Sequence, residues 1–220
     1  PTGSGKSSLM SGVIAHRVSD ENNHENVLTY EAPIEYVYDR VCKGANIVVQ
    51  HEIEPVSGHL KTFAAGIRSA LRQAPTTILV GESRDEETFD NFMKAANTGH
   101  LALTTMHVNS VADIPNRVIS EFPSGVRKAR LLEFCASSKV WCVQLLVPKV
   151  GGGRVPIREF LILTPEHIEK LSNTEPENVR DVVFNMVRKD GQTLEQSAKR
   201  YLEDGKITEK RYKLISAGAF

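Results

Sequence analysis

Hydrophobic and polar positions follow two periods along the first part of the chain. Leu9, Val13 and Ile14 recur at helical spacing, which predicts a helix that begins near Lys6. Short apolar runs predict strands at residues 26–32, 47–50, 76–82 and 101–107. Stretches of helical period between and after these runs predict helices at residues 59–73, 86–97 and 110–120. Strands that alternate with helices predict an α/β fold with a mostly parallel central sheet.

The pattern changes after Phe122-Pro123. A helix is predicted at residues 127–138, and two strand-like runs on either side of three glycines predict a β-hairpin over residues 140–163. The tail reads as helical, with N-caps at Thr164 and Thr193. We therefore expect a core over residues 1–123, a further core helix and hairpin over 124–163, and a small helical subdomain over 164–220.

Composition restricts the classes of protein that this chain can represent. Its 220 residues are 40% hydrophobic and 25% charged, which is ordinary for a soluble globular domain. No run reaches the roughly 20 apolar residues of a membrane span, and we expect no signal peptide. Equal numbers of basic and acidic residues, 27 each, argue against a broad nucleic-acid-binding surface. Cys42, Cys135 and Cys142 form no CxxC pair, so we expect buried thiols and neither zinc nor a disulfide framework.

The first eight residues have the pattern of a phosphate-binding loop. In this type of loop, glycines allow a tight turn whose N–H groups point at phosphate oxygens, and the following helix directs its positive end at the same anion. Lys6 is expected to reach the β- and γ-phosphates, and the Ser7 hydroxyl to bind Mg²⁺. The full pattern needs a glycine before the first residue, so we expect the sequence to be a fragment. The expected nucleotide-binding residues are Pro1, Thr2, Gly3, Ser4, Gly5, Lys6, Ser7 and Ser8.

Acidic residues follow two of the predicted strands. Glu82 comes directly after the run at residues 76–82 and is expected at the carboxyl edge of the sheet, where ligands bind. There it can contact the Mg²⁺ shell, through water if not directly, or order the attacking water. Glu31 and Glu35 follow the first strand around Pro33, and either can act as a general base or hold the metal through water. The alternative for all three is a solvated loop acid.

Histidines and arginines provide further candidates. His100 and His107 flank the predicted strand at residues 101–107, and His107 is expected at its carboxyl end, where it can sense or donate to the γ-phosphate. The alternative for each is a hydrogen-bonded structural histidine. Arg68 and Arg72 share a helix face and can reach phosphate in the same subunit or across a subunit boundary. The alternative is that they, like Arg84, are surface arginines or pair with nearby acids.

The order of four motifs resembles the secretion-type ATPases of the GspE/PilT superfamily, which are the motors of type II secretion, type IV pili and type IV secretion. The motifs are the phosphate-binding loop, EAPIE from Glu31, TILVGE from Thr77, and TGHLALTTMHVNS from Thr98. They look like that family's Walker A, Asp box, Walker B and His box. TYEAPIEYVYD, LLVP and GGGRVPIREFLIL resemble the DotB-like and conjugative TraJ-like branch of type IVB secretion.

The resemblance implies roles for individual residues. Lys6 and Ser7 match the nucleotide and Mg²⁺ residues, Glu35 the glutamate that activates water, and Glu82 the Walker B glutamate. His107, with His100, matches the histidines that link the nucleotide state to neighbouring structure. Glu31, Arg68 and Arg72 stay auxiliary candidates. Many relatives have an acid where this chain has Ala32, Ala74 and Thr76, so the resemblance supports no further carboxylate beside the metal.

The resemblance also implies an assembly. This chain would be a RecA-like motor domain that binds ATP and Mg²⁺ without zinc. The full-length protein would form a hexameric ring in the cytoplasm, peripheral at the inner membrane of a bacterium, and would contact inner-membrane secretion-machine proteins without binding nucleic acid directly. We thus predict an ATP-hydrolysing motor for secretion, conjugation or pilus function. The alternatives are a nucleic-acid-translocating or recombinase-like ATPase, a P-loop phosphotransferase, and a nucleotide-gated structural ring with little turnover.

Overall fold

A computed structural model describes residues 3–56 and 58–219 of the chain. Its residue contacts divide the chain into two compact units. One unit lies within Lys6–Met106, and the other combines the described residues before Lys6 with the described residues from His107 onward. The predicted boundary after Pro123 differs from this division, because the helices that follow His107 pack on the later helices and the hairpin.

The Lys6–Met106 unit is built on a four-stranded sheet in the order β2-β1-β3-β4, in which every neighbouring pair is parallel. The strands are short and rich in β-branched residues. Each parallel pair needs a crossover connection, and helices lie between β2 and β3 and between β3 and β4. The elements in chain order are α1 (Lys6–Val18), β1 (Asn26–Glu31), β2 (Ile47–Glu52), α2 (Phe63–Ala70), β3 (Thr77–Val80), α3 (Glu86–Asn97) and β4 (Leu101–Thr104).

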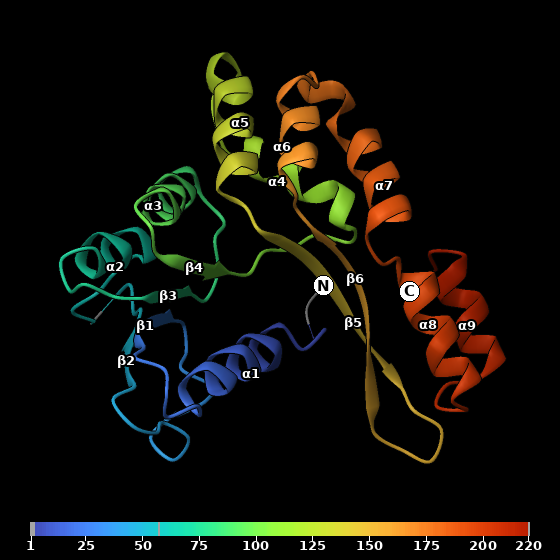
Figure 1. The fold of residues 1–220 in the computed structure, drawn as a ribbon, viewed down its shortest axis with the longest axis horizontal. Coiled ribbons are helices and arrows are strands. Elements are labelled where there is room, and N and C mark those ends of the chain that lie inside the picture. The colour runs from blue at the N-terminus through green and yellow to red at the C-terminus, as the bar shows by residue number, and fades with distance from the viewer. Residues whose placement is uncertain (1–2, 57, 220) are drawn as a thin grey trace. The chain divides into compact units, whose positions relative to one another are not determined.

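Helices cover both faces of this sheet (Figure 1). Alternate residues of a strand point to opposite faces. Leu28 and Ile78 accordingly pack with α2 and α3, while Val27 and Leu79 pack with α1. Tyr30 lies against Gly66 of α2, where an added Cβ would lie only 2.4 Å from the tyrosine ring.

The ends of α2 follow from local chemistry. The Thr62 side chain accepts a hydrogen bond from the N–H of Ala65 and caps the helix N-terminus. Beyond the helix, Ala74 has a positive φ of 46°, and Pro75 disfavours helical backbone in the residue before it. The Thr62 cap explains why the helix begins later than the predicted stretch at residues 59–73.

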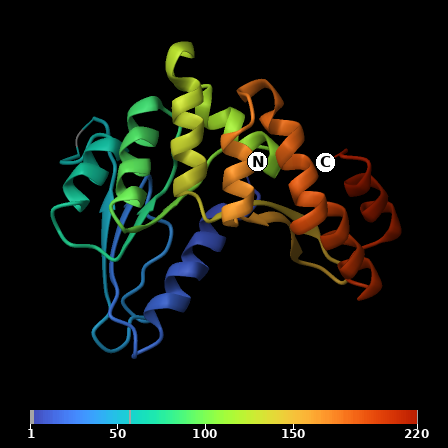
Figure 2. The same ribbon diagram turned by 45° about the horizontal axis from the view of Figure 1, so that its top comes forward.

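The unit that follows Met106 contains helices and one antiparallel hairpin. The hairpin pairs β5 (Val140–Pro148) with β6 (Arg154–Ile162), and Gly151, Gly152 and Gly153 between them all have positive φ. Figure 2 shows α5, α6 and α7 side by side on one side of the hairpin. The helical elements are η1 (Val111–Asp113), α4 (Ile114–Ile119), η2 (Ser124–Val126), α5 (Arg127–Ser137), α6 (Pro165–Ser172), η3 (Pro176–Asn178), α7 (Val179–Asp190), α8 (Leu194–Glu203) and α9 (Glu209–Ser216).

The hairpin has a core of its own. Leu145, Val155 and Ile157 pack against α8 and α9, and Trp141 of β5 stacks on Phe134 of α5 at 5.6 Å between ring centroids. Capping boxes begin α6 at Thr164 and α8 at Thr193. The predicted α/β class, the parallel sheet and the hairpin are confirmed. Within residues 3–56 and 58–219, no helix is both long and apolar enough to cross a bilayer.

Candidate active site

The phosphate-binding loop turns on two glycines and leads into α1. Gly3 and Gly5 have φ of 72° and 79°, a region that residues with a side chain rarely adopt. Ser4 between them is buried, and its hydroxyl has no hydrogen-bond partner in the part of the chain that the structure describes. No acidic residue stands in the first turn of α1, so no side chain of that turn offsets the positive end of the helix dipole. Pro1 and Thr2 lie outside the described residues.

Lys6, the first residue of α1, lies within electrostatic reach of Glu82. Burial lowers the pKa of the Lys6 ammonium below its usual value, and the Glu82 carboxylate offsets part of this effect. Both groups are only partly buried, so an incoming anion can approach them. Glu82 lies two residues beyond the end of β3, and its role at Mg²⁺ or at the attacking water stays a prediction.

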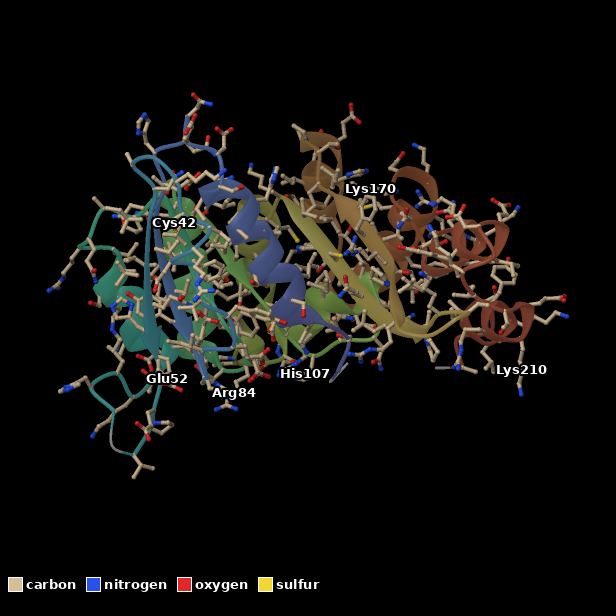
Figure 3. The ribbon with its side chains drawn as sticks, turned by 90° about the horizontal axis from the view of Figure 1, so that it is seen from below. Cys42, Glu52, Arg84, His107, Lys170 and Lys210 are labelled. Atoms are coloured by element: carbon tan, nitrogen blue, oxygen red, sulfur yellow. The ribbon has the colours of Figure 1, made fainter. Side chains whose placement is uncertain are left out.

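The carboxyl ends of β1, β3 and β4 are tied together around Glu82. The N–H of Gly81 donates to the Tyr30 carbonyl at 2.7 Å, and the Thr105 hydroxyl donates to the Gly81 carbonyl at 2.6 Å. A Cβ on Gly81 would approach the Tyr30 oxygen to 3.2 Å, so glycine lets the two backbones lie close together here. Figure 3 shows Glu52 and Arg84 at this edge, with Cys42 at the opposite end of the same unit.

The segment after β1 separates the two acids of the EAPIE motif. The Glu31 carboxylate accepts hydrogen bonds from the Thr29 hydroxyl at 2.6 Å and the Gln50 amide at 3.1 Å, so it is held against the sheet. Glu35 is exposed. Its neighbour Tyr36 is tied down twice, because its hydroxyl hydrogen-bonds Ser8 at 2.7 Å and its carbonyl accepts from Gln50 at 2.8 Å.

These contacts place the Glu35 segment beside the N-terminus of α1. Ser8, the partner of Tyr36, directly follows the expected Mg²⁺ residue Ser7. Ser7 itself is exposed at the start of the helix. Of the two acids, Glu35 has the exposed carboxylate and Glu31 the engaged one, which favours Glu35 as a base.

The remaining candidates lie elsewhere in their units. His100 precedes β4, and its Nδ1 lies 3.0 Å from the Ala95 carbonyl at the end of α3. Arg68 forms an ion pair with Glu87 between α2 and α3. Arg72 follows α2 near Asn26, whose side chain donates to the carbonyls of the adjoining turn at the amino edge of the sheet. Arg72 thus lies at the amino edge of its own unit. His107 is exposed just beyond β4.

A magnesium ion fits the donors present. Among the described residues, no group of three or more His, Cys, Asp or Glu side chains is arranged to hold a metal ion. Mg²⁺ needs no such group, since it commonly binds through one or two protein oxygens together with substrate phosphates and water. The Ser7 hydroxyl and the Glu82 carboxylate are oxygen donors of this kind.

Comparison with known protein families shows to which family the chain belongs. Residues 1–151 match the family described as type II/IV secretion system protein. The chain belongs to this family. The resemblance to the secretion-type ATPase superfamily, inferred from four sequence motifs, is thereby confirmed.

Solved structures of family members superpose closely on the chain. The X-ray structure of the Legionella pneumophila ATPase DotB matches with a TM-score of 0.93 at 39% identity, covering 100% of this chain and 59% of that one. The crystal structure of the pilus retraction motor PilT with bound ADP matches with a TM-score of 0.82 at 32% identity, covering 96% of this chain and 58% of that one.

Curated sequences give the same picture. The Pseudomonas aeruginosa protein named type IV pilus retractation ATPase PilT is 39% identical over 169 residues, which cover 75% of this chain and 46% of that protein. The chain spans about half the length of the curated relatives that it matches, with 46% to 54% of three of them covered.

Sequence reasoning missed several residues that support the site of this family member. Gln144 of β5 donates to the carbonyls of Ser4 and Gly5, and Arg158 of β6 donates to Gln144. Glu159, the next residue of β6, accepts hydrogen bonds from the hydroxyl of Ser110, which ends the His-box motif, and from the N–H of Val111, which follows it. A single glutamine inside the apolar run VWCVQLLVP was the available signal, because a polar side chain in a buried strand needs a partner.

Proposed function

We propose that the chain is the catalytic part of an ATP-hydrolysing motor that serves a type IV secretion, conjugation or type IV pilus machine. One observation carries the proposal: Lys6 begins a helix directly after a loop with two positive-φ glycines, within electrostatic reach of the strand-end acid Glu82. Family membership supports it, as do matched relatives that are named as ATPases and one whose structure holds ADP.

In this proposal, the loop and α1 bind the phosphates of ATP. Backbone N–H groups at the helix N-terminus and the Lys6 ammonium neutralise their negative charge. The buried Ser4 hydroxyl is a further donor at the same loop. Ser7 and Glu82 would hold Mg²⁺, which would supply positive charge against the β- and γ-phosphate oxygens.

Glu35 is proposed as the general base for hydrolysis. Its carboxylate accepts a proton from the attacking water, whose oxygen forms a bond to the γ-phosphorus as the bond to the ADP oxygen breaks. The Glu31 carboxylate already accepts two hydrogen bonds, whereas the exposed Glu35 stands in a segment that Tyr36 ties to the start of α1. His107 is proposed to respond to the γ-phosphate, while His100 and Arg68 are assigned to structural contacts.

Assembly is a separate part of the proposal. We propose that the full-length protein forms a hexameric ring in the cytoplasm at the inner membrane and contacts membrane components of its machine, and that Arg72 faces a neighbouring subunit. Family membership supports this part. Light scattering of the full-length protein with and without ATP tests it. A ring-sized species in ATP is expected, and a monomer under both conditions would contradict it.

The deciding experiment is steady-state ATP hydrolysis by the full-length protein. Lys6→Ala should reduce turnover by about 100-fold or more, because it removes the charge at the phosphates. Lys43→Ala, an exposed loop lysine, is the matched control and should hydrolyse ATP at the wild-type rate. Wild-type turnover in Lys6→Ala would contradict the assignment of the loop.

A further inference from the structure

The phosphate-binding loop rests on a polar side chain inside the hairpin. Gln144 of β5 is 7% exposed, and its amide nitrogen lies 2.8 Å from the Ser4 carbonyl oxygen and 3.1 Å from the Gly5 carbonyl oxygen. The amide NH₂ has two hydrogens, one for each of these acceptors. The loop also packs on the hairpin directly, since a Cβ on Gly5 would lie 2.9 Å from Leu146.

Arg158 fixes which end of the Gln144 amide faces the loop. The two residues are cross-strand partners in the hairpin, and Nε of Arg158 donates to Oε1 of Gln144 at 2.8 Å. An arginine has no acceptor, so it can bond only the oxygen end and leaves the NH₂ end directed at the loop. The backbone of Arg158 is also held, because its carbonyl accepts a hydrogen bond from the Gln192 side-chain amide at 2.8 Å.

The two bonded carbonyls determine where the loop's N–H groups point. In a planar trans peptide, the carbonyl of one residue and the N–H of the next point in opposite directions. When the carbonyls of Ser4 and Gly5 face Gln144, the N–H groups of Gly5 and Lys6 face away from it. Backbone N–H groups presented together on one side of a glycine loop form an anion site.

We propose that Gln144, oriented by Arg158, is a positioning residue for nucleotide phosphate binding. This proposal rests on the proposed ATPase function and extends it to two residues outside the phosphate-binding loop. Gln144 does not touch the nucleotide. It holds the loop in the conformation that presents the N–H groups of Gly5 and Lys6 to the phosphates.

The test measures the affinity of the full-length protein for fluorescent ADP with Mg²⁺. Gln144→Glu keeps the length of the side chain and its bond to Arg158 but loses both donors, and Gln144→Met keeps the volume without polar atoms. Each should weaken ADP binding by about tenfold or more, because two hydrogen bonds that shape the site are lost. Arg154→Ala, an exposed arginine at the start of β6, is the matched control and should bind like wild type.

A double-mutant cycle separates positioning from loss of structure. Arg158→Ala should weaken ADP binding less than Gln144→Met does, and the double variant should be no weaker than Gln144→Met, because both changes act through one amide. Thermal melting identifies any variant that fails to fold; if both Gln144 variants fail, Arg158→Ala decides the matter. ADP affinities within twofold of wild type in folded variants would overturn the proposal. A wild-type protein that binds no nucleotide would instead overturn the proposed function.

Discussion

Carboxylates at the amino ends of the strands of the four-stranded sheet (its amino edge) differ in burial and hydrogen bonding from those at the carboxyl ends (its carboxyl edge). At the amino edge, Glu25 is buried. Its carboxylate accepts hydrogen bonds from the Thr76 and Thr77 hydroxyls and forms an ion pair with Arg17. At the carboxyl edge, Glu35 is exposed. Glu82, at the same edge, is half-buried and lies within reach of the Lys6 ammonium.

This difference indicates where the unit uses its charges for stability and where it keeps them for a ligand. A buried carboxylate whose hydrogen bonds are all internal has little capacity left for substrate. Bonds from several donors hold the pKa of Glu25 below its ordinary value despite burial, which alone would raise it. The carboxylate at the amino edge therefore serves stability, whereas the exposed Glu35 at the carboxyl edge can still meet a ligand. Three substitutions sharpen or break this contrast.

The largest effect is expected at Glu35. Glu35→Gln removes the proposed base and should lower the turnover of the full-length ATPase by about 100-fold or more. ADP affinity and melting temperature should stay at wild-type values, because the side chain is exposed. Turnover and nucleotide binding are measured on the same preparation.

Two further variants calibrate that result. Glu31→Gln should lower turnover by less than about tenfold, because its carboxylate serves the sheet through Thr29 and Gln50. Glu54→Gln, an exposed acid of the same unit, should be unchanged. If Glu31→Gln lost more activity than Glu35→Gln, the two roles would have to be exchanged.

At the amino edge, the expected loss is in stability. Glu25→Ala leaves the hydroxyls of Thr76 and Thr77 and the Arg17 guanidinium without their shared acceptor. The free energy of unfolding in urea should fall by about 2 kcal/mol. Glu21→Ala, an exposed acid nearby, is the control and should change it by less than about 0.5 kcal/mol. Equal losses in both variants would remove the contrast between the edges.

The Glu25 contribution should depend on pH in one direction. Because the folded-state pKa lies below the ordinary value of 4.5, the stabilisation is present above that pH and is lost as pH falls through the folded-state pKa. The stability difference between wild type and Glu25→Ala should therefore be constant from pH 8 to about pH 5 and shrink in more acidic buffer. A difference that grew on acidification would contradict this assignment.

The smallest effect is expected from the tie between Tyr36 and α1. Tyr36→Phe removes only the hydroxyl that hydrogen-bonds Ser8. If that bond positions the Glu35 segment, turnover should fall by about two- to tenfold with ADP affinity unchanged. Tyr212→Phe breaks a comparable bond to Glu195 in the helical tail and is the matched control. A Tyr36→Phe variant as active as Tyr212→Phe would show that the tie is dispensable.

Much of the fold was predictable because its signals are local. The apolar runs, the glycines of the loop and the caps at Thr164 and Thr193 each act within a few residues. The position of Glu82 at the carboxyl edge followed from the strand before it. A helix that connects parallel strands runs back to their amino edge, so the position of Arg72 could have been anticipated in the same way.

Long-range partners were not predictable from the pattern. The choice between Glu31 and Glu35 depends on Gln50, which comes from the next strand. The support of the loop by Gln144 joins residues that are 140 positions apart in the sequence. The boundary after Met106 likewise depends on which helices pack together. The spacing of residues along the chain does not indicate such contacts, because they form only when the fold brings distant residues together.

The close fit of Tyr30 against Gly66 implies a rule for how related sequences can vary. An alanine at position 66 would push its methyl group into the ring, and α2 would have to move away from the sheet to admit it. A homologue that replaces this glycine therefore needs a smaller residue at position 30, unless its α2 lies farther from the sheet. Positions 30 and 66 should therefore covary among homologues. In a homologue that replaces Gly66 and keeps Tyr30, we expect α2 to lie farther from the sheet.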